Sequence, residues 1–316
     1  MKQFTLPEQV EICEVAPRDG FQAETKWIPT DEKVKIINEL AKTGIQSMEI
    51  TSFVHPKAIP QLKDAEEVVN RTRELSNIQF RALVPNLRGA ERAVSVGIKK
   101  LKLMLSATDS HSISNANCTV MEAQQNQEKI ITFANKENVI VSGSISVAFG
   151  CPYEGEVPVE KLILIVDRYA KLGITEISLA DTTGMGNPKQ VSELLQILKG
   201  DYPNMEFSMH FHNTRGLAIA NVIAALQQGI TKFDSSIAGL GGCPYAPGAS
   251  GNIATEDLVY ALESMHITTG INLDAIIQTA KTTKSIIGHD GGSYMLQAGP
   301  ITTLQNKPTE QNKMEA

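Results

Sequence analysis

Short apolar runs alternate with longer amphipathic segments along most of the chain. The runs are rich in β-branched residues and mostly apolar on both faces, which is typical of strands in a parallel sheet covered by helices. The intervening segments repeat apolar residues every three or four positions, which predicts helices. In the first of them Val34, Ile37 and Leu40 share one face, and Thr30 or Asp31 can cap its start.

The pattern predicts eight strand–helix units in succession. Strand first, they are Val10–Val15 and Asp31–Lys42, Ser47–Thr51 and Pro60–Thr72, Gln79–Val84 and Leu87–Val96, Lys100–Leu105 and Thr119–Lys136, Val139–Val147 and Val159–Leu172, Thr175–Ala180 and Pro188–Leu198, Met205–Phe211 and Leu217–Gln228, and Lys232–Ile237 and Thr255–Met265. Eight such units favour a (β/α)8 TIM barrel over an open doubly wound sheet. No GxGxxG follows the first strand, which argues against a dinucleotide-binding fold.

One more helix, Leu273–Ile287, follows the eighth unit, so we expect an α/β TIM barrel with a short C-terminal helical extension. The 316 residues would suggest two domains by length alone, at about 150 residues each. The count of units instead predicts a single catalytic domain over residues 8–300. Residues 301–316 are polar and are expected to form a flexible tail.

Composition excludes several classes of protein. With 42% hydrophobic residues, 20% charged residues and a net charge of −6, the chain is neither disordered nor a nucleic-acid binder. The four cysteines are scattered without a CxxC spacing, which argues against a zinc knuckle or a disulfide framework. The N-terminus lacks an apolar leader, and no run approaches the ~18 apolar residues of a membrane span. We therefore expect a cytoplasmic protein with no membrane or nucleic-acid partner.

Chemistry in a TIM barrel lies at the carboxyl ends of the strands, and five of the eight predicted ends carry ionisable or metal-ligating groups. His210 and His212 are two apart on an extended segment, so both point to one face. With Asp19 after the first strand they suggest a divalent metal site. The alternative is a pair of hydrogen-bonded interior histidines.

The other strand-end groups allow two interpretations each. Arg18 can form a salt bridge at the barrel mouth or stabilise a carboxylate or enolate oxygen of a substrate. Glu49 can fix Arg18 or act directly, and Asp181 can cap a helix or serve as an acid in the pocket. Cys243, in a loop with five glycines from Gly239 to Gly251, can act as acid or base. Spacing alone does not separate it from Cys151, which also stands in a Gly-Cys-Pro-Tyr context.

Six segments together resemble the hydroxymethylglutaryl-CoA lyases of the metal-dependent lyase/aldolase TIM-barrel superfamily. They are RDGFQ, EITSFVHPKAIPQL, GCPYEGEVP, SLADTTG, HFHNTRG and GLGGCPYAPGASGNIATEDLVY. The resemblance runs from about residue 8 to residue 300. The last segment is specific, whereas RDG and DTTG are shared with related synthases and carboxylases.

This resemblance implies cleavage of 3-hydroxy-3-methylglutaryl-CoA, an acyl-CoA substrate, to acetyl-CoA and acetoacetate with Mg²⁺ or Mn²⁺. It implies that Asp19, His210, His212 and Asn252 ligate the metal, Arg18 stabilises the enolate, and Cys243 is the loop acid/base. Glu49 and Asp181 match acidic residues of the site, and either His210 or Asp19 relays the first proton. A homodimer is also implied, while the pathway, leucine breakdown or another, stays open.

Four departures from the family pattern leave other functions open. Asn213 stands where many members have Asp, Ala180 replaces a Gly, Phe21 replaces a Leu, and Ser142 replaces an Arg. The missing cation at Ser142 can change the acyl group that is accepted. The alternatives are a lyase of the same mechanism on another 3-hydroxy-3-carboxymethyl acyl-CoA, and a Claisen-type synthase using acetyl-CoA and a 2-oxo acid. A non-catalytic barrel would not explain why metal-type ligands, arginine and thiol occur together.

Overall fold

A computed structural model describes residues 6–242, 251–289, 291–302 and 304 of the chain. Its strands lie parallel in one sheet and are β1 (Glu11–Glu14), β2 (Ser47–Ser52), β3 (Gln79–Leu83), β4 (Lys100–Lys102), β5 (Leu105–Ser106), β6 (Ile140–Ser146), β7 (Glu176–Asp181), β8 (Glu206–Phe211) and β9 (Lys232–Ser235). The strand order is β4-β3-β2-β1-β9-β8-β7-β6-β5, and β4 also pairs with β6. This last pairing closes the sheet, because β4 and β5 are two pieces of one barrel strand. The predicted TIM barrel is confirmed.

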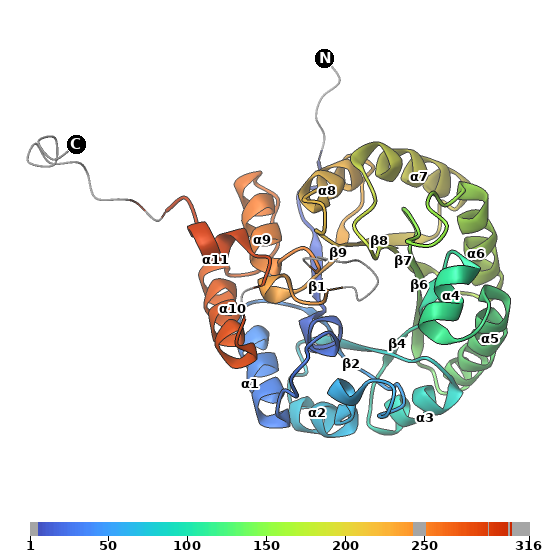
Figure 1. Cartoon of the computed structure of the whole chain (residues 1–316), viewed down its shortest axis with the longest axis horizontal. Coiled ribbons are helices and arrows are strands. Elements are labelled where there is room, and N and C mark those ends of the chain that lie inside the picture. Colours follow the sequence, from blue (N-terminus) through green and yellow to red (C-terminus); the bar gives the residue numbers. More distant parts are fainter. Residues whose placement is uncertain (1–5, 243–250, 290, 303, 305–316) are drawn as a thin grey trace, which may run out of the picture.

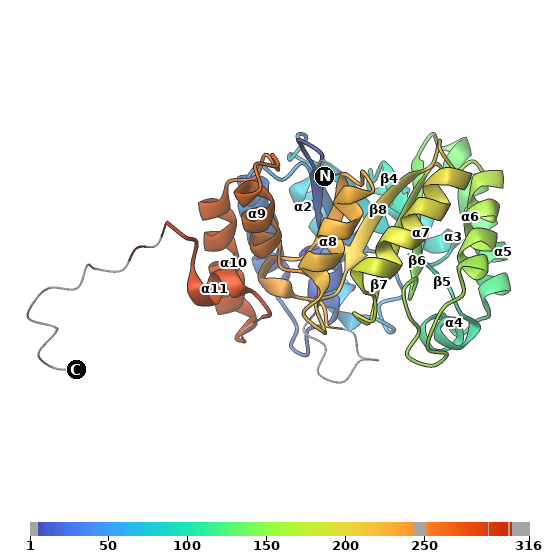
Figure 2. The same cartoon turned by 90° about the horizontal axis from the view of Figure 1, so that it is seen from above.

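Helices surround the strands as an outer ring (Figure 1), and a view from the side shows them standing along the barrel (Figure 2). They are α1 (Thr30–Ala41), α2 (Ala65–Thr72), α3 (Leu87–Ser95), α4 (Asp109–Ala116), α5 (Val120–Lys136), α6 (Val159–Lys171), α7 (Pro188–Asp201), α8 (Ala218–Gln227), α9 (Thr255–Ser264), α10 (Leu273–Ile287) and α11 (Tyr294–Ala298). Side-chain caps fix several starts. Thr119 with Glu122 and Asn187 with Gln190 form capping boxes at α5 and α7.

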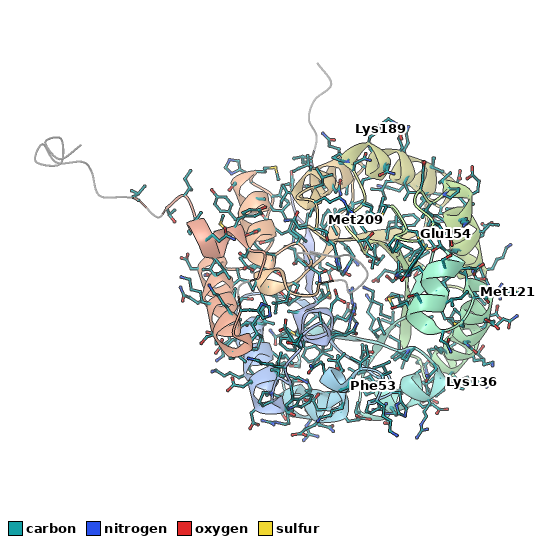
Figure 3. The ribbon with its side chains drawn as sticks, viewed as in Figure 1. Phe53, Met121, Lys136, Glu154, Lys189 and Met209 are labelled. Carbon is teal, nitrogen blue, oxygen red and sulfur yellow. The ribbon has the colours of Figure 1, made fainter. Side chains whose placement is uncertain are left out.

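The apolar core lies between the strands and the helices. Met48 and Ile50 of β2 are buried there, as is Phe211 of β8. Figure 3 shows Met121, Lys136 and Lys189 on the outer rim of the ring. The C-terminal extension packs on the same layer, since α10 contacts α1 and α9. Among the described helices, none is both long and apolar enough to cross a membrane.

The strands are not apolar on both faces as the pattern predicted. Glu49 of β2, Lys102 of β4 and Asp234 of β9 are all buried. Lys102 and Asp234 form an ion pair although β4 and β9 are not neighbours in the sheet, so this contact crosses the barrel interior. The interior of the ring is therefore polar, and only the face toward the helices is consistently apolar.

Two predicted elements differ in detail, and one element was not predicted. The helix expected over Pro60–Thr72 is a short 3-10 turn, Pro60–Leu62, followed by α2. The strand expected over Lys100–Leu105 is interrupted between β4 and β5. The segment after β1, for which no element was predicted, forms one π-helical turn, η1 (Ala16–Gly20). The tail predicted for residues 301–316 falls mostly outside the described residues.

Candidate active site

The turn η1 places two charged side chains at the carboxyl end of β1. The backbone N–H groups of Arg18 and Asp19 both donate to the carbonyl of Val15, at 3.1 and 2.7 Å. Glu14 secures the start of this turn, because its carboxylate accepts from the N–H of Ala16 at 2.8 Å and from that of Ile237, beyond β9, at 3.1 Å. The end of β1 is thereby tied to the end of β9.

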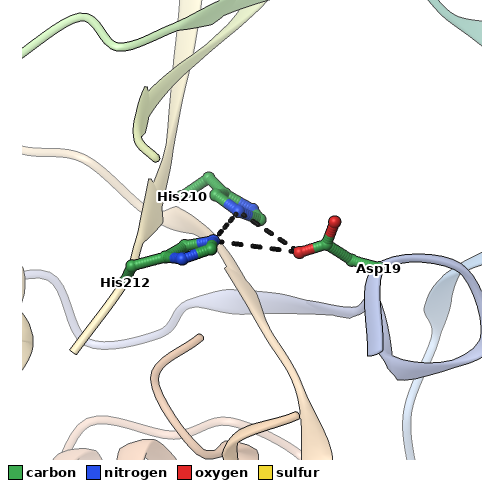
Figure 4. A group of neighbouring side chains, drawn as sticks. All are labelled: Asp19, His210 and His212. Carbon is green, nitrogen blue, oxygen red and sulfur yellow. Dashed lines mark hydrogen bonds and ion pairs between the residues drawn. The ribbon is translucent and has the colours of Figure 1, made fainter. Parts of the chain in front are cut away.

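Asp19, His210 and His212 come together there, with ligand-capable atoms that all lie within 4.8 Å of one another (Figure 4). The Nε2 atoms of the two imidazoles are 3.2 Å apart, and each is 3.8 Å from Oδ2 of Asp19. Burial lowers the pKa of His212 to about 3, which keeps this imidazole neutral, as metal ligation requires. Both histidines point to one face, as their spacing predicted.

Asn252 completes the cluster from beyond β9. Its Nδ2 donates to Oδ2 of Asp19 at 2.7 Å, and its buried Oδ1 has no hydrogen-bond partner among the described residues. Gly241 permits this approach, since it has a φ of +100° and a Cβ there would lie 2.5 Å from the Asn252 amide nitrogen. A carboxylate, two imidazoles and an orphaned amide oxygen are a donor set that fits a divalent cation.

Arg18 lies directly beside this cluster and is 6% exposed. Its NH1 group donates to Oδ1 of Asp19 and its Nε donates to Oε1 of Glu49. The neighbouring carboxylates raise its pKa above its ordinary value, although burial opposes this rise. Glu49 is fully buried, and its contact with Arg18 is the one that the interpretation of Glu49 as a support for Arg18 expects.

Asp181 is buried at the end of β7, and its carboxylate accepts from the N–H groups of Met185 and Gly186, at 2.8 and 3.0 Å. It therefore shapes the loop before α7, while the cap of α7 itself is Asn187. Burial raises the pKa of Asp181 to about 6. Among the described residues, the hydrogen bonds of its carboxylate are with the backbone of its own loop.

The two cysteines that the sequence left as alternatives, Cys151 and Cys243, differ in what the structure describes of them. Cys243 lies outside the described residues. Cys151 is buried, with its sulfur 3.1 Å from the hydroxyl of Thr108. Cys13 is buried below η1, and desolvation raises the pKa of its thiol to about 12, which makes it a poor nucleophile.

The sequence pattern missed the interior charges that support these groups. Arg81, Lys102 and Asp234 link Glu49 to His210 through ion pairs inside the barrel. The sequence gives one indication of these residues, because each is a charged residue within a predicted strand that is otherwise mostly apolar. Ser142, where the family pattern has Arg, pairs in register with Lys102 on the adjacent strand.

Comparisons with known proteins show the family to which the chain is related. The HMGL-like family model matches residues 9–283. The hydroxymethylglutaryl-CoA lyase YngG of Bacillus subtilis is 45% identical over 291 residues, which are 92% of this chain and 97% of that protein. The human mitochondrial hydroxymethylglutaryl-CoA lyase is 40% identical over 294 residues, 93% of this chain and 90% of the relative.

Among solved structures, that of an HMG-CoA lyase from Acinetobacter baumannii in complex with coenzyme A and 3-methylmalate is similar. It superimposes with a TM-score of 0.91 at 42% identity, covering 95% of this chain and 98% of that one. Sequence and fold therefore agree over nearly the whole chain. The chain belongs to the HMGL-like family.

Proposed function

We propose that the protein cleaves 3-hydroxy-3-methylglutaryl-CoA to acetyl-CoA and acetoacetate, with Mg²⁺ or Mn²⁺ and as a homodimer. The observation that carries the proposal is the Asp19–His210–His212 cluster with Arg18 against it at the carboxyl ends of the strands. The names of the relatives support the substrate. The coenzyme A and hydroxy diacid bound by the Acinetobacter relative support a thioester with a hydroxyl and a carboxylate close together.

Asp19, His210, His212 and Asn252 are the residues that would hold the cation. When bound, a divalent cation supplies Lewis acidity that lowers the pKa of an alcohol and anchors a carboxylate. The chain itself contributes the imidazole of His212, which burial keeps neutral, and the carboxylate of Asp19, whose pKa Arg18 holds below its ordinary value although burial opposes this. These two groups are thus in the protonation state that binding needs.

The reaction needs two proton transfers and one bond cleavage. A base takes the proton of the tertiary hydroxyl, the bond between C2 and C3 breaks as the ketone forms, and the electron pair moves onto the thioester as an enolate. The guanidinium of Arg18 stabilises the enolate oxygen. Cys243 then donates a proton to the enolate carbon, giving acetyl-CoA, and Asp181 keeps the neighbouring loop in shape.

Either His210 or Asp19 takes the hydroxyl proton. The Nδ1 of His210 lies 3.3 Å from Oδ2 of Asp234, which orients the ring so that its Nε2 faces Asp19 and His212.

A second candidate is a lyase of the same mechanism with another acyl group, and Ser142 is the observation that favours it. A panel of 3-hydroxyacyl-CoA thioesters, scored for acetyl-CoA release with Mg²⁺ or Mn²⁺ present, separates the two. We expect the highest kcat/KM with the 3-hydroxy-3-methylglutaryl thioester. A higher value for a bulkier or smaller analogue would favour the second candidate, and release from none would contradict both. Condensation of acetyl-CoA with a 2-oxo acid would instead indicate a synthase.

A further inference from the structure

Two buried cations bridge the same two carboxylates inside the barrel. Arg81 donates from Nε to Oε2 of Glu49 and from NH2 to Oδ2 of Asp234, both at 2.8 Å. Lys102 Nζ lies 3.2 Å from that oxygen of Glu49 and 2.9 Å from that oxygen of Asp234. We call these four residues the interior quartet. Each carboxylate is held from two sides, so neither can turn without breaking two ion pairs.

The interior quartet touches the candidate active site at two points. The second oxygen of Glu49 accepts from Nε of Arg18, and Oδ2 of Asp234 lies 3.3 Å from Nδ1 of His210. Arg18 follows β1 and His210 belongs to β8, so the quartet connects two groups that are remote in sequence. The orientation of both groups depends on carboxylates that Arg81 and Lys102 hold in place.

Burial makes this dependence strong. No member of the quartet is more than 6% exposed, and its two positive and two negative charges balance. Removing one cation leaves buried negative charge without its partner, and water cannot readily replace it. Lys102 is also the cation on the strand paired with Ser142, the position where the family pattern has Arg. Lys102 therefore places a positive charge on the strand next to that position.

We infer that Arg81 and Lys102 are positioning residues, which fix Glu49 and Asp234 and through them hold Arg18 and His210 in their working geometry. Among the described residues, their hydrogen bonds and ion pairs are with Glu49 and Asp234 and not with Asp19, His212 or Asn252. The inference rests on the proposed function for its rate measurement only. Its metal measurement needs no substrate.

The test compares Lys102→Met with Lys100→Met. Lys100 is two residues earlier on β4 and is also buried, but it pairs with Glu176 at 2.7 Å and, among the described residues, forms no hydrogen bond or ion pair with the quartet. Each variant therefore removes a buried lysine of β4 and the ion pairs that it forms. The Mn²⁺ affinity of each variant is measured by calorimetry on the metal-free protein. The values of kcat and KM are measured with the methylglutaryl thioester, and Tm is measured by thermal unfolding.

We expect Lys102→Met to weaken Mn²⁺ binding about 10- to 100-fold, the usual effect of losing support behind a ligand. We expect kcat to fall at least about tenfold with KM changed less than threefold, since a lost orientation acts in the transition state. Lys100→Met should lower Tm but keep Mn²⁺ affinity and kcat within threefold of the parent. Equal losses in both variants, or no loss in Lys102→Met, overturn the inference.

If Lys102→Met does not fold, Arg81→Lys is used as the test variant in its place. It keeps the charge but is too short to reach both carboxylates as the guanidinium does. The same losses in metal affinity and kcat are expected, and parental values would overturn the inference. If the parent binds Mn²⁺ but cleaves no thioester, the proposed function fails while the metal measurement still decides the inference.

Discussion

Glu49→Gln tests how the barrel interior supports Arg18. The substitution keeps the shape of the side chain but removes a fully buried charge that faces Arg18, Arg81 and Lys102. In the variant these three cations would be paired with only two carboxylates, those of Asp19 and Asp234. Breaking a buried pair in this way lowers the free energy of unfolding by about 3–5 kcal/mol.

The effect on the rate follows from the bond between Arg18 Nε and Glu49. A hydrogen bond to a charged group contributes about 1.5–3 kcal/mol. If that contribution orients Arg18 toward the enolate, its loss lowers kcat about 10- to 150-fold, because 1.36 kcal/mol is a factor of ten. Steady-state acetyl-CoA release at saturating substrate and Mn²⁺ measures this, and urea unfolding measures the stability.

Glu176→Gln is the matched control, since Glu176 pairs with Lys100 at the amino-terminal end of the strands. It should keep kcat within threefold of the parent. The reasoning about Glu49 is refuted if Glu49→Gln loses the expected stability and yet keeps kcat within threefold of the parent. In that case Glu49 would only hold the barrel together.

The remaining predictions concern the metal, the thiol and pH. Asp19→Asn should weaken Mn²⁺ binding by roughly 100-fold or more, because loss of support behind a ligand alone costs up to about that much; calorimetry showing parental affinity would remove Asp19 from the ligand set. Cys243→Ala should lower kcat at least about 100-fold, the lower range for a general acid, and a rate within threefold of the parent would reject this role. Burial raises the pKa of Glu14 to about 7 and that of Glu256 to about 8, both from an ordinary 4.5. The stability that the protonated groups provide is complete below pH 4.5 and is lost as the pH rises to about 8. The free energy of unfolding, measured in urea, should therefore fall as the pH rises from about 5 to about 8.5. It should fall less steeply with pH in Glu14→Gln than in the parent protein. Equal slopes in the two proteins would contradict the assignment to Glu14.

The architecture was predictable because each strand and helix carries its own local signal. The apolar runs and the helical spacing of Val34, Ile37 and Leu40 follow from which face of each element the core covers. Helix α4 was missed because its sequence, DSHSISNA, has little amphipathic pattern. The turn η1 was not predicted, because Pro17 and Gly20 are common loop residues.

The site was predictable only where chemistry coincides with a strand end. Asp19, His210 and His212 met that condition, and the structure brings them together. Asn252 follows a loop rather than a strand, so the resemblance alone pointed to it. The ion pair of Arg81 with Asp234 joins residues 153 positions apart, and only closure of the barrel brings them into contact.

The most direct test of the proposed function is a product balance on the purified protein. With 3-hydroxy-3-methylglutaryl-CoA and Mg²⁺ or Mn²⁺, we expect acetyl-CoA and acetoacetate in equal amounts. Exhaustive chelation should stop the reaction, and returning either ion should restore it. Full activity after chelation with no metal detectable by elemental analysis would contradict the metal site, and failure to release acetyl-CoA from this thioester would contradict the proposed reaction.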